Sequence, residues 1–124
     1  MALNYNAIER QNPQTKEKKW YASPNINGKR ELKELSKDLS EVSSLSAGDV
    51  QNVIANLIEQ MPKWLMEGYS VKLDGLGSFR LSFSSEGVAS KEEVTANLVK
   101  DIHVIFDADN LIKERIQNTQ VRPA

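Results

Sequence analysis

The sequence contains no cysteine among its 124 residues. Disulfide bonds, thiolate metal sites and a cysteine nucleophile are therefore excluded, and the absence fits a reducing compartment such as the cytoplasm. Long apolar runs are missing as well, since no stretch approaches the roughly 18 consecutive apolar residues that a membrane span needs. The polar N-terminus also lacks the apolar core of a signal peptide. We expect a soluble, unsecreted chain with no membrane partner.

Groups suited to catalysis or metal binding are scarce too. His103 is the only histidine, and within an apolar run a core or dimer-contact role is the better interpretation than a metal ligand or a base. Asp74 and Ser78 flank a glycine turn but have no histidine or lysine partner at a motif spacing. The segment "DADN", residues 107–110, is more typical of a helix cap than of a catalytic carboxylate pair. We predict no enzyme activity, metal site, cofactor or small-molecule substrate.

The net charge of -1 is small, but the charges are unevenly distributed. Residues 1–40 hold eight Lys/Arg against five acids, or +3, and the remainder holds eight against twelve, or -4. A basic face, if one exists, is therefore N-terminal and could contact a polyanion. The alternative is that these lysines simply solubilise exposed elements.

Two segments that favour strands open the chain. "LNYNAIE" and "KKWYASP" lie on either side of "RQNPQTKE", in which Asn12-Pro13 favours a turn. This pattern predicts a β-hairpin over residues 3–23. The following "SPNING" is rich in turn residues and predicts a connector.

Two amphipathic helices are predicted next. From Lys29 onward, apolar residues recur at helical spacing up to Val42, and Ser46 with Asp49 resembles a capping box that opens a second helix. Pro62 should bend or end that second helix, and Gly68 should stop it. The apolar stripe of the second helix is wider than packing against one short helix requires, so another surface must cover it.

The stretch "VKLDGLGSFRLSF", residues 71–83, alternates apolar and polar side chains around a glycine turn and predicts a strand pair. Residues 84–101 are polar and predict a loop or arm, with a possible strand at residues 94–99. "IHVIF" predicts a short strand, and "DADNLIKERI" predicts a capped helix with Leu111, Ile112 and Ile116 facing inward. The tail should be flexible.

This order of elements resembles the bacterial histone-like HU/IHF family of DNA-binding proteins. "VKLDGLGSFRL" is similar to that family's strand, Gly-Ser/Thr-Phe turn and second strand, and "IFDADNLIKERI" to its final strand and helix. The resemblance covers roughly residues 29–117. The N-terminal hairpin lies outside the plain HU pattern and is similar to an HU-related variant of Bacteroides-type bacteria.

The resemblance implies an α+β fold with an intertwined helical dimer core, an antiparallel sheet that forms a saddle, and a C-terminal helix, with an extra N-terminal hairpin. The expected organisation is a hairpin and connector at 1–28, an HU/IHF-like domain at 29–118 and a flexible tail at 119–124. A homodimer would cover the wide stripe of the second helix. The residues expected at the dimer interface are Val50, Val53, Ile54, Leu57, Ile58 and Met61.

The implied function is that of a histone-like architectural protein of the nucleoid, which holds double-stranded DNA without sequence preference through phosphate and minor-groove contacts. Bending of the duplex would be a further effect of such contacts. The candidate DNA-contacting residues are Lys16, Lys18, Lys19, Lys29, Arg30, Arg80 and Pro13. The family's basic arm with an Asn-Pro tip that wedges into the minor groove has no counterpart in residues 84–101, which lack proline and arginine. "QNPQTKEKK" resembles that tip, but a plain hairpin turn is the better interpretation of Pro13. The acidic arm also leaves open an alternative, an HU-like dimeric scaffold that has lost DNA binding.

Overall fold

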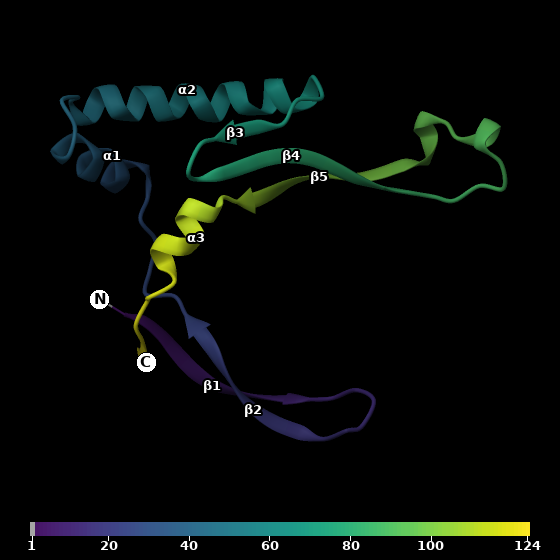
Figure 1. Ribbon diagram of the computed structural model, residues 1–124, viewed down its shortest axis with the longest axis horizontal. Helices are drawn as coiled ribbons and strands as arrows, with labels where there is room; N and C mark the ends of the chain where they lie inside the picture. The colour runs from purple at the N-terminus through teal and green to yellow at the C-terminus, as the bar shows by residue number, and fades with distance from the viewer. Residues whose placement is uncertain (1) are drawn as a thin grey trace. The chain divides into compact units, whose positions relative to one another are not determined.

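The computed structural model describes residues 2–124 and divides into two compact units (Figure 1). The first unit combines the residues up to Glu31 with Ile116–Ala124, and the second is Leu32–Arg115. None of the helices in the described residues is long and apolar enough to cross a membrane. Each unit contains a three-stranded sheet of its own.

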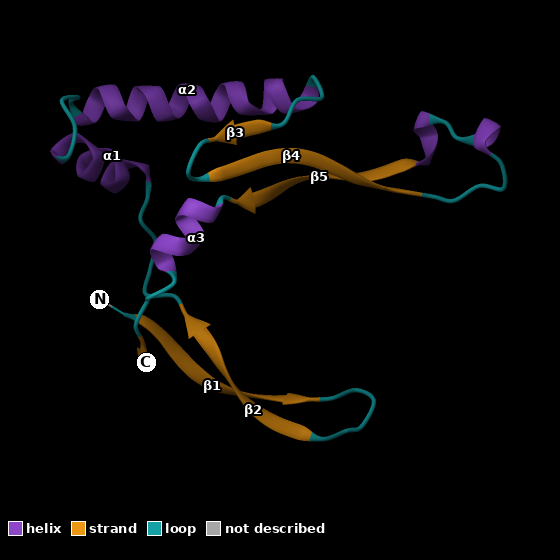
Figure 2. Ribbon diagram, in the orientation of Figure 1, coloured by secondary structure: helices purple, strands orange, loops and turns teal. Residues whose placement is uncertain are grey.

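The sheet of the first unit has the strand order β2-β1-β6, in which β6 is Val121–Pro123. Figure 2 shows the hairpin that β1 and β2 form. Strands β1 (Leu3–Gln11) and β2 (Lys18–Asn25) pair antiparallel, as the predicted hairpin requires. Their register sets Ala7 opposite Ala22, and the pairing continues without interruption to Gln11 opposite Lys18. The hairpin prediction is confirmed, although β2 extends two residues into the segment expected to be a connector.

The loop of this hairpin is held by hydrogen bonds from its own backbone and from Asn12. The amide of Asn12 donates to the carbonyl of Glu17 and the amide of Lys16 to the carbonyl of Asn12, each over 2.8 Å. Asn12 Oδ1 accepts from the amide of Gln14 over 2.9 Å, which is the Asx turn that this residue type favours. Pro13 lies inside this closed turn, in a trans peptide bond.

The segment expected to be a flexible tail instead contains a strand. β6 (Val121–Pro123) pairs parallel with the start of β1, Leu3 opposite Val121. The amide of Leu3 donates to the carbonyl of Gln120 over 2.8 Å, and the amide of Ala124 to that of Tyr5 over 2.9 Å. The expectation was wrong because the edge of β1 opposite β2 offers unpaired backbone groups that a short segment can satisfy.

The second unit begins with the two predicted helices, α1 (Leu32–Glu41) and α2 (Ala47–Met66). The Oγ atom of Ser46 accepts a hydrogen bond from the amide of Asp49 over 3.1 Å, which confirms the predicted N-cap. At the other end Gly68 has a φ of 95°, and the amides of Gly68 and Tyr69 return to carbonyls of the last helical turn. Helix α2 continues through Pro62, so this proline does not end it.

The sheet of the second unit has the order β3-β4-β5, with β3 (Val71–Leu73), β4 (Gly77–Ser85) and β5 (Val99–Ala108) all antiparallel. Helix α2 packs against β3 and β4. Phe79 and Phe106 lie opposite each other, and their ring centroids are 4.8 Å apart. The second unit is therefore α+β with an antiparallel three-stranded sheet, as expected.

Two details of β5 differ from the expectations. The ladder shifts register between Ser82 and Ser84, and Asp101, opposite this irregularity, has a φ of 56°. His103 Nδ1 lies 2.7 Å from the carbonyl oxygen of Asp101, to which its N–H can donate. His103 is exposed, so it does not belong to the core of one copy, and of the two roles expected for it only the dimer contact stays a prediction.

The arm between β4 and β5 contains two short 3₁₀ helices, Lys91–Glu93 and Ala96–Leu98. The strand considered for residues 94–99 is absent from the described arm, because β5 begins only at Val99. Both 3₁₀ helices follow a residue in extended conformation, and neither has a side-chain cap. The arm is therefore irregular at its tip, as its polar sequence indicated.

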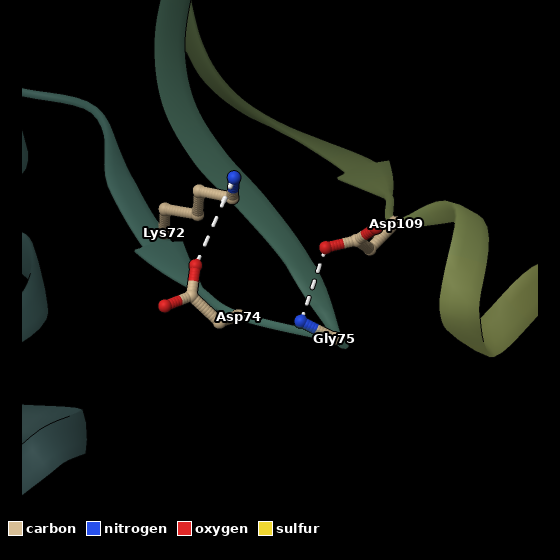
Figure 3. A network of polar contacts seen from close by, with 4 residues as sticks. All are labelled: Lys72, Asp74, Gly75 and Asp109. Carbon is tan, nitrogen blue, oxygen red and sulfur yellow. Dashed lines mark hydrogen bonds and ion pairs between the residues drawn. The ribbon is translucent and has the colours of Figure 1, made fainter.

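A carboxylate joins the glycine turn to the C-terminal helix α3 (Asn110–Ile116). Asp109 Oδ2 accepts a hydrogen bond from the amide of Gly75 over 3.0 Å (Figure 3). The amide of Asp109 donates to the carbonyl of Leu76 over 2.9 Å. Of the helix side chains expected to face inward, Leu111 and Ile116 are exposed and Ile112 is half-buried. These three side chains therefore pack less completely than expected.

The Gly75 amide holds the pKa of the Asp109 carboxyl below its ordinary value of 3.8. Partial desolvation opposes this shift, whereas the amides of Leu111 and Asn110 and the charge of Lys72 support it. The carboxylate is thus favoured in its charged form by the fold itself. Through its hydrogen bonds to Gly75 and Leu76, Asp109 holds the glycine turn next to the start of α3.

A substitution at Gly77 should destabilise the chain far more than one at Lys72. Gly77 has a φ of 157°, and a Cβ placed there would collide with the carbonyl oxygen of Asp107 and lie 2.7 Å from the ring of Phe106. We expect Gly77→Val to lower the free energy of unfolding by about 2 kcal/mol or more, and Lys72→Val by about 0.5 kcal/mol at most. Urea denaturation of both variants measures this. Equal midpoints would contradict the turn assignment.

The Asp109 contact should make stability depend on pH in acid. Because its pKa is lower in the folded state, the stabilisation is present above the ordinary value of 3.8 and is lost as the pH falls through the folded-state pKa. We expect Asp109→Asn to be less stable than the parent at pH 7, with the difference shrinking below pH 3.8. Urea unfolding across this range measures it. Asp74→Asn, whose parent carboxylate is 93% exposed, is the control and should show little difference at any pH.

Candidate nucleic-acid interface

Side chains alternate across the N-terminal sheet, so its residues separate into two faces. One face, called here the cationic face, has no carboxylate on its described strand positions. Arginine and lysine lie near the hairpin loop, a second arginine lies on β6, and polar residues fill most of the space between them. Its members are Asn4, Asn6, Ile8, Arg10, Lys19, Tyr21, Ser23, Asn25 and Arg122.

A shallow hollow lies at the loop end of the cationic face. The guanidinium carbon of Arg10 lies 5.9 Å from the centroid of the Tyr21 ring, within the range of a cation–π contact. Arg10, Lys19 and Tyr21 line a shallow hollow of about 360 Å³, together with Glu17 and Asn12 from the loop. Two cations, an aromatic ring and amide groups in one hollow can contact a phosphate backbone, while Glu17 reduces the local positive charge.

The other face, called here the apolar face, has a different composition. Glu9 and Lys18 are its charged members, and their side chains lie 3.9 Å apart. The remaining residues are almost all apolar, and most of them are exposed. Its members are Leu3, Tyr5, Ala7, Glu9, Gln11, Lys18, Trp20, Ala22, Pro24, Val121 and Pro123.

The structure separates the lysines that the sequence grouped together. Lys19 lies on the cationic face, Lys18 lies on the apolar face beside Glu9, and Lys16 lies in the loop with a φ of 59°. Lys29 and Arg30 are exposed in the connector between the sheet and α1. The predicted residues therefore do not form one surface.

Arg10, Tyr21 and Arg122 of the cationic face were not among the candidate DNA-contacting residues. A loop centred on Pro13 would place Arg10 opposite Lys16 and turn Tyr21 to the other face. The observed register, with Arg10 opposite Lys19, is centred between Gln14 and Thr15, so the sequence did not predict which residues share this face. No local signal marks Arg122, because its position follows from the pairing of β6 with β1.

The outer face of the second sheet, away from α2, is much less cationic. Arg80 Nε lies 3.3 Å from Asp107 Oδ2, and Lys72 Nζ lies 3.7 Å from Asp74 Oδ1. Each cation on this face thus has an acidic neighbour that reduces its attraction for phosphates. Arg80, one of the candidate DNA-contacting residues, is exposed but paired.

The arm is no richer in free positive charge. Within residues 84–101 the two lysines stand against four acids. Lys100 lies 3.9 Å from Glu86 across the base of the arm. Across residues 2–124, moreover, no cluster of histidine and acidic side chains comes together as a metal site would need.

An apolar groove runs along α2 where the helix meets the sheet. It has a volume of about 530 Å³ and is lined by Leu57, Ile58, Met61, Pro62, Leu65, Met66, Phe79, Leu81 and Val104. Of the residues expected at a dimer interface, Ile58 is 62% exposed and Val53 60% exposed, whereas Val50 is already buried at 7%. Ile54, Leu57 and Met61 are half-buried. Two of these six residues are therefore exposed in one copy, and three more are only partly covered.

Two solved structures share this fold. A candidate DNA-binding protein from Bacteroides vulgatus superposes with a TM-score of 0.66 at 17% identity, over 99% of this chain and 49% of that protein. HU from Anabaena, solved with DNA, superposes with a TM-score of 0.56 at 19% identity, over 72% of this chain and 99% of that one. This chain thus spans about half the length of the Bacteroides protein. No curated protein sequence matches it.

The fold is therefore that of the HU class of bacterial proteins, as the sequence resemblance implied. The chain belongs to the HU-HIG family, described as an HU domain fused to a wHTH, Ig or glycine-rich motif, whose profile matches residues 1–123.

Proposed function

We propose that the protein is a homodimeric architectural protein that binds duplex DNA without sequence preference, through phosphates, in the bacterial nucleoid. The observation that carries this proposal is the cationic face of the N-terminal sheet on an HU-type chain. It supplies the positive surface that the acidic arm lacks. Neither catalysis nor a cofactor is needed for this role.

The dimer part of the proposal is supported by the groove along α2. Only Val50 and Leu65 are buried apolar residues among those described, which is a very small core for a chain of this length. The groove and the exposed side chains of Val53 and Ile58 provide an apolar surface that a second α2 can cover. Burial of that surface would complete the core of the second unit.

The DNA part is supported by how the charges are paired. On the second sheet, Arg80 and Lys72 each have a carboxylate within 4 Å, whereas Arg10 and Lys19 share a hollow with an aromatic ring. Phosphate contacts from lysine and arginine carry no base information, so they give affinity without sequence preference. The hairpin turn is closed by its own hydrogen bonds, which supports Pro13 as a turn residue rather than a wedge.

Removing cations from the cationic face should weaken DNA binding and flatten its dependence on salt. We expect Arg10→Ala with Lys19→Ala to reduce the slope of log K against log salt by about 0.9 for each phosphate that the variant no longer neutralises. Lys18→Ala, on the opposite face beside Glu9, is the matched control and should leave the slope nearly unchanged. Fluorescence anisotropy with a labelled duplex at several salt concentrations measures both.

Two other results would redirect the proposal. If the paired change has no effect and Arg80→Ala abolishes binding, the second sheet is the contact surface. If the parent protein does not bind even at low salt, the chain is a dimeric scaffold rather than a DNA-binding protein.

A charge in the α2 groove should prevent dimer formation. Leu57 is half-buried within one copy and lines the groove, so Leu57→Asp would place an unpaired carboxylate in the proposed interface. We expect dissociation or unfolding, with a loss on the order of 3 kcal/mol. Sedimentation velocity at micromolar concentration measures this. Asn52→Asp, at an exposed position of the same helix, should remain dimeric, and a stable, folded parent monomer would contradict the proposal.

A further inference from the structure

The apolar face of the N-terminal sheet has no covering within its own unit. None of the residues described in this unit, 2–31 and 116–124, is buried. Trp20 is 68% exposed and Val121 is 57% exposed, and Ala7, Ala22 and Pro24 between them are exposed as well. A sheet with one apolar face gains stability when that face packs against another layer.

The charges of this face exclude several kinds of partner. Glu9 and Lys18 lie 3.9 Å apart and sum to zero, so the face offers no net attraction to a polyanion or to a strongly charged protein. Phosphates are better accommodated by Arg10 and Lys19 on the opposite face. The partner of the apolar face should therefore be apolar itself, with one acid and one base of its own.

A second copy of the same face meets these requirements. Glu9 lies on β1 and Lys18 on β2. Consider a two-fold axis that runs parallel to the strands, midway between the two facing sheets and over the boundary between β1 and β2. This axis sets β1 of one copy over β2 of the other. Each carboxylate then comes near the partner's lysine, so the charges are complementary in the pair.

The sizes of the side chains fit this arrangement as well. Ala7 and Ala22 lie opposite each other and form a shallow depression across two strands. On one side of it stands Trp20, and on the other stand Tyr5 and Pro24. A bulky side chain beside a small pair allows two identical faces to interdigitate, as packed sheets do.

We propose that the apolar face of the N-terminal sheet packs against the same face of a second copy of this chain. The contact is separate from the α2 groove and from DNA binding. It buries Trp20 and Val121 between two sheets and leaves both cationic faces exposed. Where one pair of chains makes this contact and the α2 contact together, each contact raises the effective concentration for the other.

Cross-linking of the full-length chain tests which surface lies next to which. The sequence has no cysteine, so Ala7→Cys introduces a single thiol at the centre of the apolar face, and Asn6→Cys introduces one on the cationic face. Packed sheets lie about 10 Å apart, so a bis-maleimide of similar reach should link two Ala7→Cys chains. Asn6→Cys, on the outside of the pair, should link several-fold less.

Fluorescence of Trp20 gives an independent measurement. In a Trp64→Phe background Trp20 is the remaining tryptophan. We expect a blue-shifted emission and several-fold weaker quenching by acrylamide than for a free tryptophan, with or without duplex DNA. Adding Ala7→Lys, which places like charges at the centre of the pair, should restore the quenching, whereas adding Asn6→Lys should not.

Four results would overturn the inference. If Trp20 is fully quenched and Ala7→Cys does not cross-link, the face is open. If Trp20 is protected only when DNA is added, the face binds nucleic acid. If Trp20 is protected but Ala7→Cys forms no link between chains, another part of the same chain covers the face. If both thiols cross-link equally, the contact is not specific.

These outcomes are separate from the proposed function. Salt-dependent DNA binding and dimerisation through Leu57 can both hold while Ala7→Cys fails to cross-link, and then the inference alone fails. Conversely, Ala7→Cys can cross-link in a protein that binds no DNA. In that case the proposed function fails and the packing of the two sheets stands.

Discussion

Burial of apolar side chains is the constraint on which the rest of this structure depends, because one copy of the chain does not complete it. Among the described residues the buried apolar side chains are Val50 and Leu65, one near each end of α2. A chain of 124 residues ordinarily buries well over half of the surface that its unfolded form exposes. The groove along α2 and the apolar face of the N-terminal sheet are the places where apolar side chains stay uncovered in one copy.

Alternation of side chains along the strands separates apolar from cationic residues in the N-terminal sheet. The hairpin that directs Trp20 to one face directs Arg10 and Lys19 to the other, so its register determines the composition of both faces. A shift of one residue in either strand would mix the two sets. The Asx turn at Asn12 closes the loop that fixes this register. In the second sheet the equivalent separation exists, but acidic residues such as Asp107 accompany the cations.

The sequence was informative wherever local chemistry determines the structure. The cap at Ser46, the stop at Gly68, the glycine turn and the N-terminal hairpin follow from short-range preferences, and the HU-type order of elements followed from their succession. The candidate site was predicted less well, because neighbouring lysines in the sequence point to opposite faces. Lys18 and Lys19 show this directly.

What was missed depends on contacts between distant positions. β6 forms only because the free edge of β1 accepts it, so neither the strand nor the placement of Arg122 has a local signal. The bond between Asp109 and Gly75 joins residues 34 positions apart. The arm was indeterminate for a different reason: its polar sequence has no period that favours helix or strand, and it forms short 3₁₀ turns.

The two-sided character of the N-terminal sheet has a mechanical consequence. When two such sheets stack through their apolar sides, Arg10 and Lys19 of one copy point away from Arg10 and Lys19 of the other. A stiff duplex that follows one of these outer surfaces cannot also reach the opposite one. The second surface is then free to hold another stretch of DNA, so the assembly would bridge separate segments and tie them into loops, rather than only curve the one it sits on.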